Sequence, residues 1–376
     1  MCKTMNWKAP ISILALSAVL AGCGSAGESS SSKDAEMTAE EKIVVDELNR
    51  EVTIPKEVDR VVMGGILPYF STWYVGTNST EEIVGMHPNS YNAASNSILK
   101  EMSPDVLEVD TSFIQNGEVN IEALMEMNPQ VYFEIATDEK SINKLEESGI
   151  STVALRTNYA EDEGPIDTMS RWLQLTGEIT GITDRPDQII EEGRKNQEEI
   201  DAVLKDVKAE DKPRVMILQY HSDGEISVAG ANMHGNKWIK ATGGIDVAEQ
   251  DVDGIKAVNM EQIYKWDPDI IYITNFTETQ PEDLFNNSIQ GQDWSQLKAV
   301  QNKQVYKIPL GIYRWYPPSG DAPLMLKWMA QKNHPDLFDY DMVEEIQTYY
   351  AKYYDYDVSE ERVQSILHPS SDAAKY

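Results

Sequence analysis

One pattern of polar and apolar residues occurs twice in the chain. Residues 119–135 read VNIEALMEMNPQVYFEI, and residues 258–274 read VNMEQIYKWDPDIIYIT. In each copy an asparagine, Asn120 or Asn259, precedes a short amphipathic stretch, and an Asn-Pro or Asp-Pro pair ends that stretch. Asparagine is a favoured N-cap, and the residue before a proline is driven out of the helical region. Each copy therefore predicts a short helix followed by a buried strand of β-branched and aromatic residues.

The segments that follow the two copies are also alike. After the first copy we expect a strand at 152–155 and a helix that carries Trp172; after the second, a strand at 305–308 and a helix that carries Trp328. Strands that alternate with helices are typical of parallel sheets covered by helices. The predicted fold class is therefore α/β, with two Rossmann-like lobes of parallel sheet and a ligand cleft between them.

A long polar helix is predicted to join the two lobes. Residues 184–208 carry Pro186 in the first turn and few apolar positions, so the helix cannot be buried on all sides. The folded part of the chain then divides into an N-terminal α/β lobe at 42–183, a linker helix at 184–208 and a C-terminal α/β lobe at 209–376.

The start of the chain has the pattern of an export signal. Lys3 and Lys8 precede the apolar run ISILALSAVLAG, which is too short to span a bilayer, so residues 1–22 are predicted to be a signal peptide. The run ends in Leu-Ala-Gly-Cys, which resembles a bacterial lipobox and implies lipid attachment to Cys23. A secreted protein with an ordinary cleavage site is the alternative. Residues 23–41 are rich in serine and then acidic, which predicts a disordered tether.

Charge and cysteine content exclude several classes of function. The chain carries a formal net charge of -31, whereas nucleic acid and anionic lipid surfaces select basic patches. We therefore expect no nucleic-acid partner, and the lipid on Cys23 rather than charge would hold the protein at a membrane. Removal of the signal peptide would also remove Cys2, so no internal disulfide is expected.

Candidate ligand-binding residues follow the predicted strands, because open parallel sheets bind ligands beyond the carboxyl ends of their strands. The candidates are Tyr69, His87, Tyr91, Tyr220, His221, Tyr313, Arg314 and Trp315. Arg314 could bind an anion through two hydrogen bonds or stack on a flat ligand, or it could pair with a surface carboxylate. Tyr313 and Trp315 fit the core of a lobe equally well.

Motifs of metal binding and catalysis are absent from the sequence. It contains no HExxH, no pair of CxxC motifs, no GxSxG and no Walker A loop. We therefore predict no catalytic residue, no resident metal and no cofactor.

Further stretches give the chain a family resemblance. They are DELNREVTIPKEVDRVV, GNKWIKATGGIDVAEQ and KQVYKIPLGIYRWYPPSGDAPLMLKWMAQKNHPDLF, in addition to the two repeats. Together these stretches resemble the substrate-binding lipoproteins of ABC importers, in the class for ferric siderophores, haem and cobalamin, over nearly all of residues 42–350. The resemblance implies a protein on the outer face of the cell membrane that captures an iron chelate and delivers it to a permease dimer with a cytoplasmic ATPase.

The resemblance also assigns a role to the acidic residue of each repeat. In this family an acidic residue on each lobe docks onto arginines of the permease, and Glu122 and Glu261 occupy the matching positions. Either residue also fits the first turn of a helix, where a carboxylate complements the helix dipole.

Other functions stay open at this point. Some members that resemble the GNKWIKATGG stretch take molybdate or tungstate, which Arg314 and His221 would suit. A surface metal-dependent hydrolase that uses His87 and His221, or an adhesin with an acidic surface, would also fit the export signal.

Overall fold

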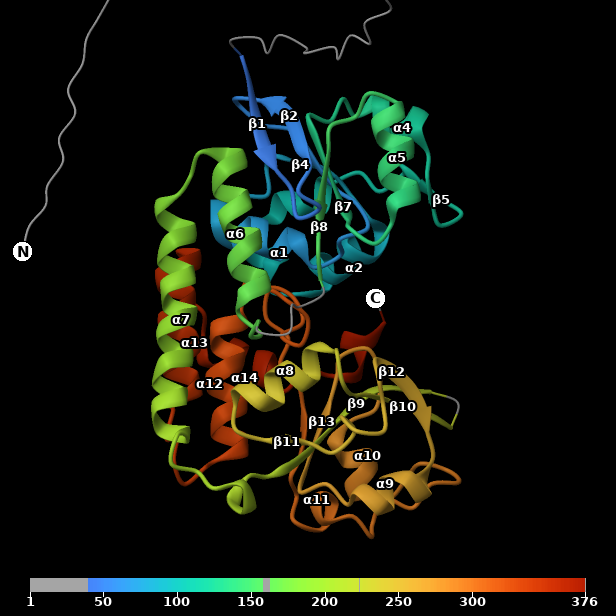
Figure 1. Cartoon of the computed structure of the whole chain (residues 1–376), viewed down its shortest axis with the longest axis vertical. Helices are drawn as coiled ribbons and strands as arrows, with labels where there is room; N and C mark the ends of the chain where they lie inside the picture. The colour runs from blue at the N-terminus through green and yellow to red at the C-terminus, as the bar shows by residue number, and fades with distance from the viewer. Residues whose placement is uncertain (1–39, 158–162, 223, 376) are drawn as a thin grey trace, which may run out of the picture. The chain divides into compact units, whose positions relative to one another are not determined.

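The computed structural model describes residues 40–157, 163–222 and 224–375 (Figure 1). The predicted signal peptide, Cys23 and nearly all of the predicted tether lie outside these ranges. Residues Ala39–Tyr376 form one compact unit. None of the helices in the described ranges is both long enough and apolar enough to cross a membrane.

The N-terminal half is built on a four-stranded parallel sheet in the order β4-β3-β7-β8. Its strands are β3 (Val61–Met63), β4 (Ile83–Met86), β7 (Val131–Ile135) and β8 (Thr152–Leu155). Two small antiparallel pairs accompany it: β1 (Glu41–Val45) with β2 (Glu51–Pro55), and β5 (Ile114–Gln115) with β6 (Glu118–Val119). The helices of this half are α1 (Tyr69–Thr77), α2 (Pro88–Asn96), α3 (Leu99–Met102), α4 (Ile121–Glu126), α5 (Glu139–Glu147) and α6 (Asp167–Thr180), with the 3₁₀ turn η1 (Pro104–Glu108).

The C-terminal half has a mixed sheet in the order β12-β10-β9-β13-β14, with β11 also paired to β9. Its strands are β9 (Arg214–Ser222), β10 (Glu225–Ala229), β11 (Ile245–Asp246), β12 (Ile255–Val258), β13 (Ile270–Ile273) and β14 (Val305–Lys307). Strands β9, β13 and β14 run parallel as predicted, but β10 runs antiparallel to both of its neighbours, β9 and β12. The reason is the short connection from β9 to β10, because a parallel crossover needs a dozen or more residues.

Helices cover this second sheet and continue to the end of the chain. They are α8 (His234–Ala241), α9 (Met260–Trp266), α10 (Pro281–Phe285), α11 (Lys298–Gln301), α12 (Ala322–Asn333), α13 (Met342–Tyr354) and α14 (Glu360–Leu367), with the 3₁₀ turns η2 (Ala209–Asp211) and η3 (Ser371–Ala374). Trp172 and Trp328 are buried in α6 and α12, the two helices predicted to carry them.

Both copies of the repeat form the predicted helix and strand. The side chain of Asn120 accepts a hydrogen bond from the backbone N–H of Ala123 at 3.2 Å, and Asn259 accepts one from Gln262 at 2.9 Å. After each helix, the residue before the proline has a positive φ, 49° at Asn128 and 39° at Asp267, and the chain then enters β7 or β13. The N-cap and the X-Pro pair thus set the limits of each helix.

Helix α7 (Asp184–Leu204) packs against elements of both halves. It begins where predicted and ends at Leu204 rather than at residue 208. It contacts α1 and α6 in the N-terminal half and α12 in the C-terminal half, as can be followed in Figure 1. A Cβ at Gly193 would lie 2.9 Å from Cγ2 of Ile166 and 3.7 Å from Cγ of Pro323, so a residue without a side chain allows this close approach. The lobe limits at 42–183 and 209–376 stay a prediction.

Candidate functional site

The loop that follows β14 is buried and not open to a ligand. The ring of Tyr313 packs edge to face on Phe70 of α1, with 5.4 Å between ring centroids. Trp315 is fully buried, and its Nε1–H donates to Oδ2 of Asp321 at 3.0 Å. These contacts make Tyr313 and Trp315 part of the core that joins the two halves, which is the alternative that the sequence also allowed.

Arg314 is held inside the C-terminal half. Its side chain is only 4% exposed, its Nε–H donates to the carbonyl of Asn275 at 3.1 Å, and Nη2 donates to the carbonyl of Ala373 at 3.3 Å. The guanidinium also lies 4.7 Å from the centroid of the Phe276 ring. The structure therefore does not present Arg314 to a ligand, because the C-terminal segment returns to bind it.

Tyr69 and His221 are buried as well. The Tyr69 hydroxyl pairs with Oγ1 of Thr176 at 2.8 Å, inside the core of the N-terminal half. Nδ1 of His221 lies 2.8 Å from Oγ1 of Thr279, and burial lowers the pKa of the imidazole. Side chains alternate along β9, so the inward position of His221 turns Tyr220 outward. Neither Tyr69 nor His221 offers an exposed surface for a ligand.

Three of the predicted ligand residues are accessible. Tyr220 is 44% exposed at the end of β9, and its ring lies 5.7 Å from that of Phe276. His87 is half-buried at the N-cap of α2, where Nδ1 accepts from the backbone N–H of Asn89 at 3.1 Å. Because Nδ1 accepts this hydrogen bond, the neutral ring carries its proton on Nε2 and can donate it to a ligand. Burial lowers the pKa of His87, which favours this neutral form. Tyr91 is half-buried and donates to the carbonyl of Leu107 at 3.2 Å.

Reasoning from the sequence missed a buried carboxyl group at the end of β7. Glu134 is only 3% exposed, and burial, together with the nearby charge of Asp138, raises its pKa to about 7. Its Oε1 accepts from the backbone N–H of Ile135 at 2.8 Å, and a Cβ at Gly65 would come within 1.9 Å of the same atom. The sequence does contain a signal for this group, because Glu134 is an acid inside the apolar run VYFEI. The neighbouring strand β3 is followed by Gly64 and Gly65, and Gly65 leaves room for the Glu134 side chain.

Glu122 and Glu261 are exposed in the first turns of α4 and α9. Within the described ranges neither carboxylate has a lysine, arginine or histidine at ion-pair distance. Both are therefore free to meet a cationic partner. The described residues also contain no group of three His, Cys, Asp or Glu side chains that could hold a metal ion.

Two pockets receive residues from both halves. One, of about 400 Å³, is lined by residues 96–98 and by the C-terminal segment around Arg362 and His368. The other, of about 510 Å³, lies between residues 163–167, α7 and α8. Neither is lined by His87, Tyr91 or Tyr220, so the accessible candidates do not belong to these two pockets.

Comparison with known proteins identifies the class. Residues 86–310 match the periplasmic binding protein family. A solved periplasmic solute binding protein from Veillonella parvula is 31% identical, with a TM-score of 0.78 over 87% of this chain and 97% of that chain. The chain belongs to the periplasmic binding protein family, whose members are the solute-binding proteins of ABC transporters and not enzymes. The predicted α/β fold class with two lobes is confirmed.

Relatives with named ligands differ in what they bind. The molybdate-binding protein MolA of Haemophilus influenzae is 23% identical over 331 residues, which cover 84% of this chain and 91% of that protein. The Fe(3+)-citrate-binding protein YfmC of Bacillus subtilis is 26% identical over 200 residues, which cover 52% of this chain and 58% of that protein. The family is therefore clear, and the ligand has to be argued from the site.

Proposed function

We propose that this chain captures an iron chelate, such as a ferric siderophore, haem or a cobalamin-like complex, and delivers it to the permease of an ABC importer. The observation that carries the proposal is the exposed ring of Tyr220 beside Phe276, at the carboxyl end of the sheet in the C-terminal half. His87 and Tyr91 lie at the corresponding end of the other sheet. We expect the iron chelate to contact both sets.

The positions of Arg314 and His221 support the same choice. Both were candidates for binding molybdate, yet Arg314 donates to two backbone carbonyls and His221 pairs with Thr279. A small oxyanion needs several convergent donors, and these two side chains are buried, at 4% exposed for Arg314 and 9% for His221.

Molybdate is the second candidate, and one observation favours it. The relative named as molybdate-binding aligns with 84% of this chain, whereas the relative named as Fe(3+)-citrate-binding aligns with 52%.

The experiment is a titration of the soluble chain from Ser25 onward, which keeps the whole compact unit. Tryptophan fluorescence is followed on addition of ferric hydroxamate and catecholate siderophores, ferric citrate, haem, cobalamin and molybdate. We expect saturable quenching by one iron complex, weakened about tenfold by Tyr220→Ala and retained by Tyr220→Phe, because the ring provides the contact. A response to molybdate alone would replace the iron chelate with the oxyanion, and no response to any of them would overturn both.

We also propose that Cys23 carries a lipid and that Glu122 and Glu261 dock onto the permease. The Leu-Ala-Gly-Cys tetrapeptide supports the first proposal, although Cys23 lies outside the described residues. Membrane fractionation of a Cys23→Ser variant tests it: we expect the variant in the soluble fraction, and retention in the membrane would contradict the lipid anchor.

A further inference from the structure

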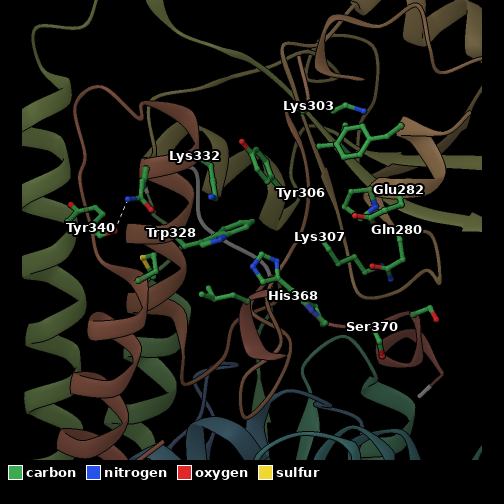
Figure 2. Close-up of a pocket in the computed structure, with 18 residues that line it drawn as sticks. Gln280, Glu282, Lys303, Tyr306, Lys307, Trp328, Lys332, Tyr340, His368 and Ser370 are labelled. Carbon is green, nitrogen blue, oxygen red and sulfur yellow. Dashed lines mark hydrogen bonds between the residues drawn. The ribbon is translucent and has the colours of Figure 1, made fainter. Parts of the chain in front are cut away.

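A third pocket, of about 580 Å³, lies beside β14 in the C-terminal half (Figure 2). It is bounded by β14, α10, α12 and the C-terminal segment that follows α14. The residues that carry the argument are Lys303, Tyr306, Lys307, Trp328, Lys332 and His368. Its volume lies within the range of roughly 300–1,000 Å³ that is usual for small-molecule sites. None of Tyr220, His87 and Tyr91 lines it, so the pocket is separate from the proposed iron-chelate site.

The charge of this pocket is opposite to that of the chain. Acidic residues outnumber lysine and arginine by 63 to 32 overall, yet the pocket is lined by three lysines and a histidine and by a single carboxylate, Glu282. Within the described ranges none of Lys303, Lys307 and Lys332 has a carboxylate at ion-pair distance. A group of cations without acidic partners indicates an anionic ligand.

The lysines are held by rings and by carbonyl groups. Nζ of Lys332 lies 5.0 Å from the centroid of the Tyr306 ring, and Nζ of Lys303 lies 4.2 Å from that of Phe285. Nζ of buried Lys307 donates to the carbonyls of Thr277 and Thr279 at 2.6 and 2.9 Å. The ring contacts position Lys303 and Lys332 without removing their charge. Lys307 contributes less, because burial lowers its pKa to about 7 and it already donates to two carbonyls. Burial also lowers the pKa of Lys332.

One wall of the pocket is a fixed aromatic surface. The rings of Tyr306 and Trp328 lie 6.3 Å apart at 79°, and the ring of Tyr272 packs behind both at 5.9 and 5.5 Å. The hydroxyl of Tyr272 donates to Oδ1 of Asn333 at 2.7 Å. Most of the surface that a flat ring can contact comes from Tyr306, which is half-buried, because Trp328 is only 3% exposed.

We propose that this pocket binds a small aromatic carboxylate, with its ring against Tyr306 and Trp328 and its carboxylate on the ammonium group of Lys332. Lys303 adds charge at the rim, since it is exposed whereas Lys332 is half-buried. Figure 2 shows Lys332 and Tyr306 beside Trp328, with His368 facing the same space from the C-terminal segment. This makes the protein a carrier of a second, organic ligand, at a site independent of its iron chelate.

Isothermal titration calorimetry of the chain from Ser25 onward tests the proposal, with phthalate as the probe. Cyclohexane-1,2-dicarboxylate keeps the charge and lacks the aromatic ring, and benzamide keeps the ring and lacks the charge. We expect saturable binding of phthalate and at least about tenfold weaker binding of both controls, since each lacks one of the two contacts.

Variants distinguish binding of phthalate at this pocket from general attraction of phthalate to lysine side chains on the surface. Lys332→Met is expected to weaken phthalate binding about tenfold or more, and Lys332→Arg to retain it, because arginine keeps the charge. Lys256→Met, which removes the same charge from an exposed position on β12, is the matched control and should leave binding unchanged. Circular dichroism of each variant establishes that it is folded.

Several results would overturn the proposal. Absence of phthalate binding, or equal binding by folded Lys332→Met, would remove the carboxylate site. Equal binding of cyclohexane-1,2-dicarboxylate would remove the role of the aromatic wall. Among the described strands β14 pairs only with β13, so its other edge could accept an added strand. Binding of an extended peptide, without binding of phthalate, would therefore indicate that the pocket binds a peptide strand.

Discussion

Glu134 is the residue whose ionisation is expected to change stability most clearly. Burial raises its pKa from the ordinary value of 4.5 to about 7. Between these two pH values the folded chain keeps the proton and the unfolded chain releases it, so stability falls as the pH rises. The loss amounts to about 3 kcal/mol of unfolding free energy, because each unit of pKa corresponds to about 1.36 kcal/mol.

The matched variant is Glu134→Gln, which cannot ionise. Urea unfolding at pH 4 and at pH 8 gives the difference in unfolding free energy between this variant and the wild type. We expect that difference to be larger at pH 8 than at pH 4. The change should be about 3 kcal/mol in favour of the variant. A difference that stays constant with pH would mean that Glu134 is solvated in the folded protein.

Individual side chains are also where reasoning from the sequence is least complete. The pattern of β9 predicts that Tyr220 and His221 face opposite sides, and the packing of the sheet then decides which of them is inside. The burial of Arg314 depends on Ala373, and no local pattern near Arg314 contains that contact. Glu134 stands out in the sequence as an acid in an apolar strand. Its burial could not be predicted, because it depends on the space that Gly65 of another segment leaves for the carboxylate.

Among the elements, helix α7 comes close to both halves at Gly193, next to Ile166 and Pro323. A Cβ at Gly193 already comes within 2.9 Å of Cγ2 of Ile166, so Gly193→Leu must push α6 or α12 away from α7. We expect the free energy of unfolding to fall by about 1–3 kcal/mol, the usual cost of an overpacked core. Thermal or urea unfolding measures the change.

Glu191→Leu is the control for Gly193→Leu. It introduces the same side chain at an exposed position of the same helix, and surface substitutions usually stay within about 0.5 kcal/mol. If both variants lose the same stability, the cause lies in the added apolar side chain and not in the packing between α6, α7 and α12.

The elements themselves were largely predictable. The N-caps Asn120 and Asn259 and the X-Pro pairs fixed the ends of α4 and α9, because capping and proline chemistry act over a few residues. Strand β8 has the predicted limits for a similar reason, since it is a short apolar run with polar ends. The antiparallel course of β10 was not foreseen, because strand direction depends on how the chain returns and not on the composition of the strand.

At the scale of the whole molecule, the exposed carboxylates of α4 and α9 lead to a prediction about transport. Glu122 and Glu261 occupy equivalent places in the two halves and have no cationic neighbour among the described residues. If both dock onto a two-part permease, replacing both with lysine should abolish uptake and leave ligand affinity unchanged, because the substitutions create like-charge contacts only in the complex. Uptake into proteoliposomes that contain the permease and its ATPase gives the first quantity, and fluorescence titration gives the second.

The control for that double variant changes the net charge equally at other sites. Glu126→Lys combined with Glu210→Lys reverses one exposed carboxylate on α4 and one on η2, and neither residue belongs to a first turn that the repeat conserves between the halves. We expect transport by this control to be close to that of the wild type. Equal loss in both double variants would indicate long-range attraction by the strongly acidic surface, whereas a loss of affinity in the Glu122 and Glu261 variant would place these residues at the ligand. Loss of uptake confined to that variant is the result that matched docking of both halves requires.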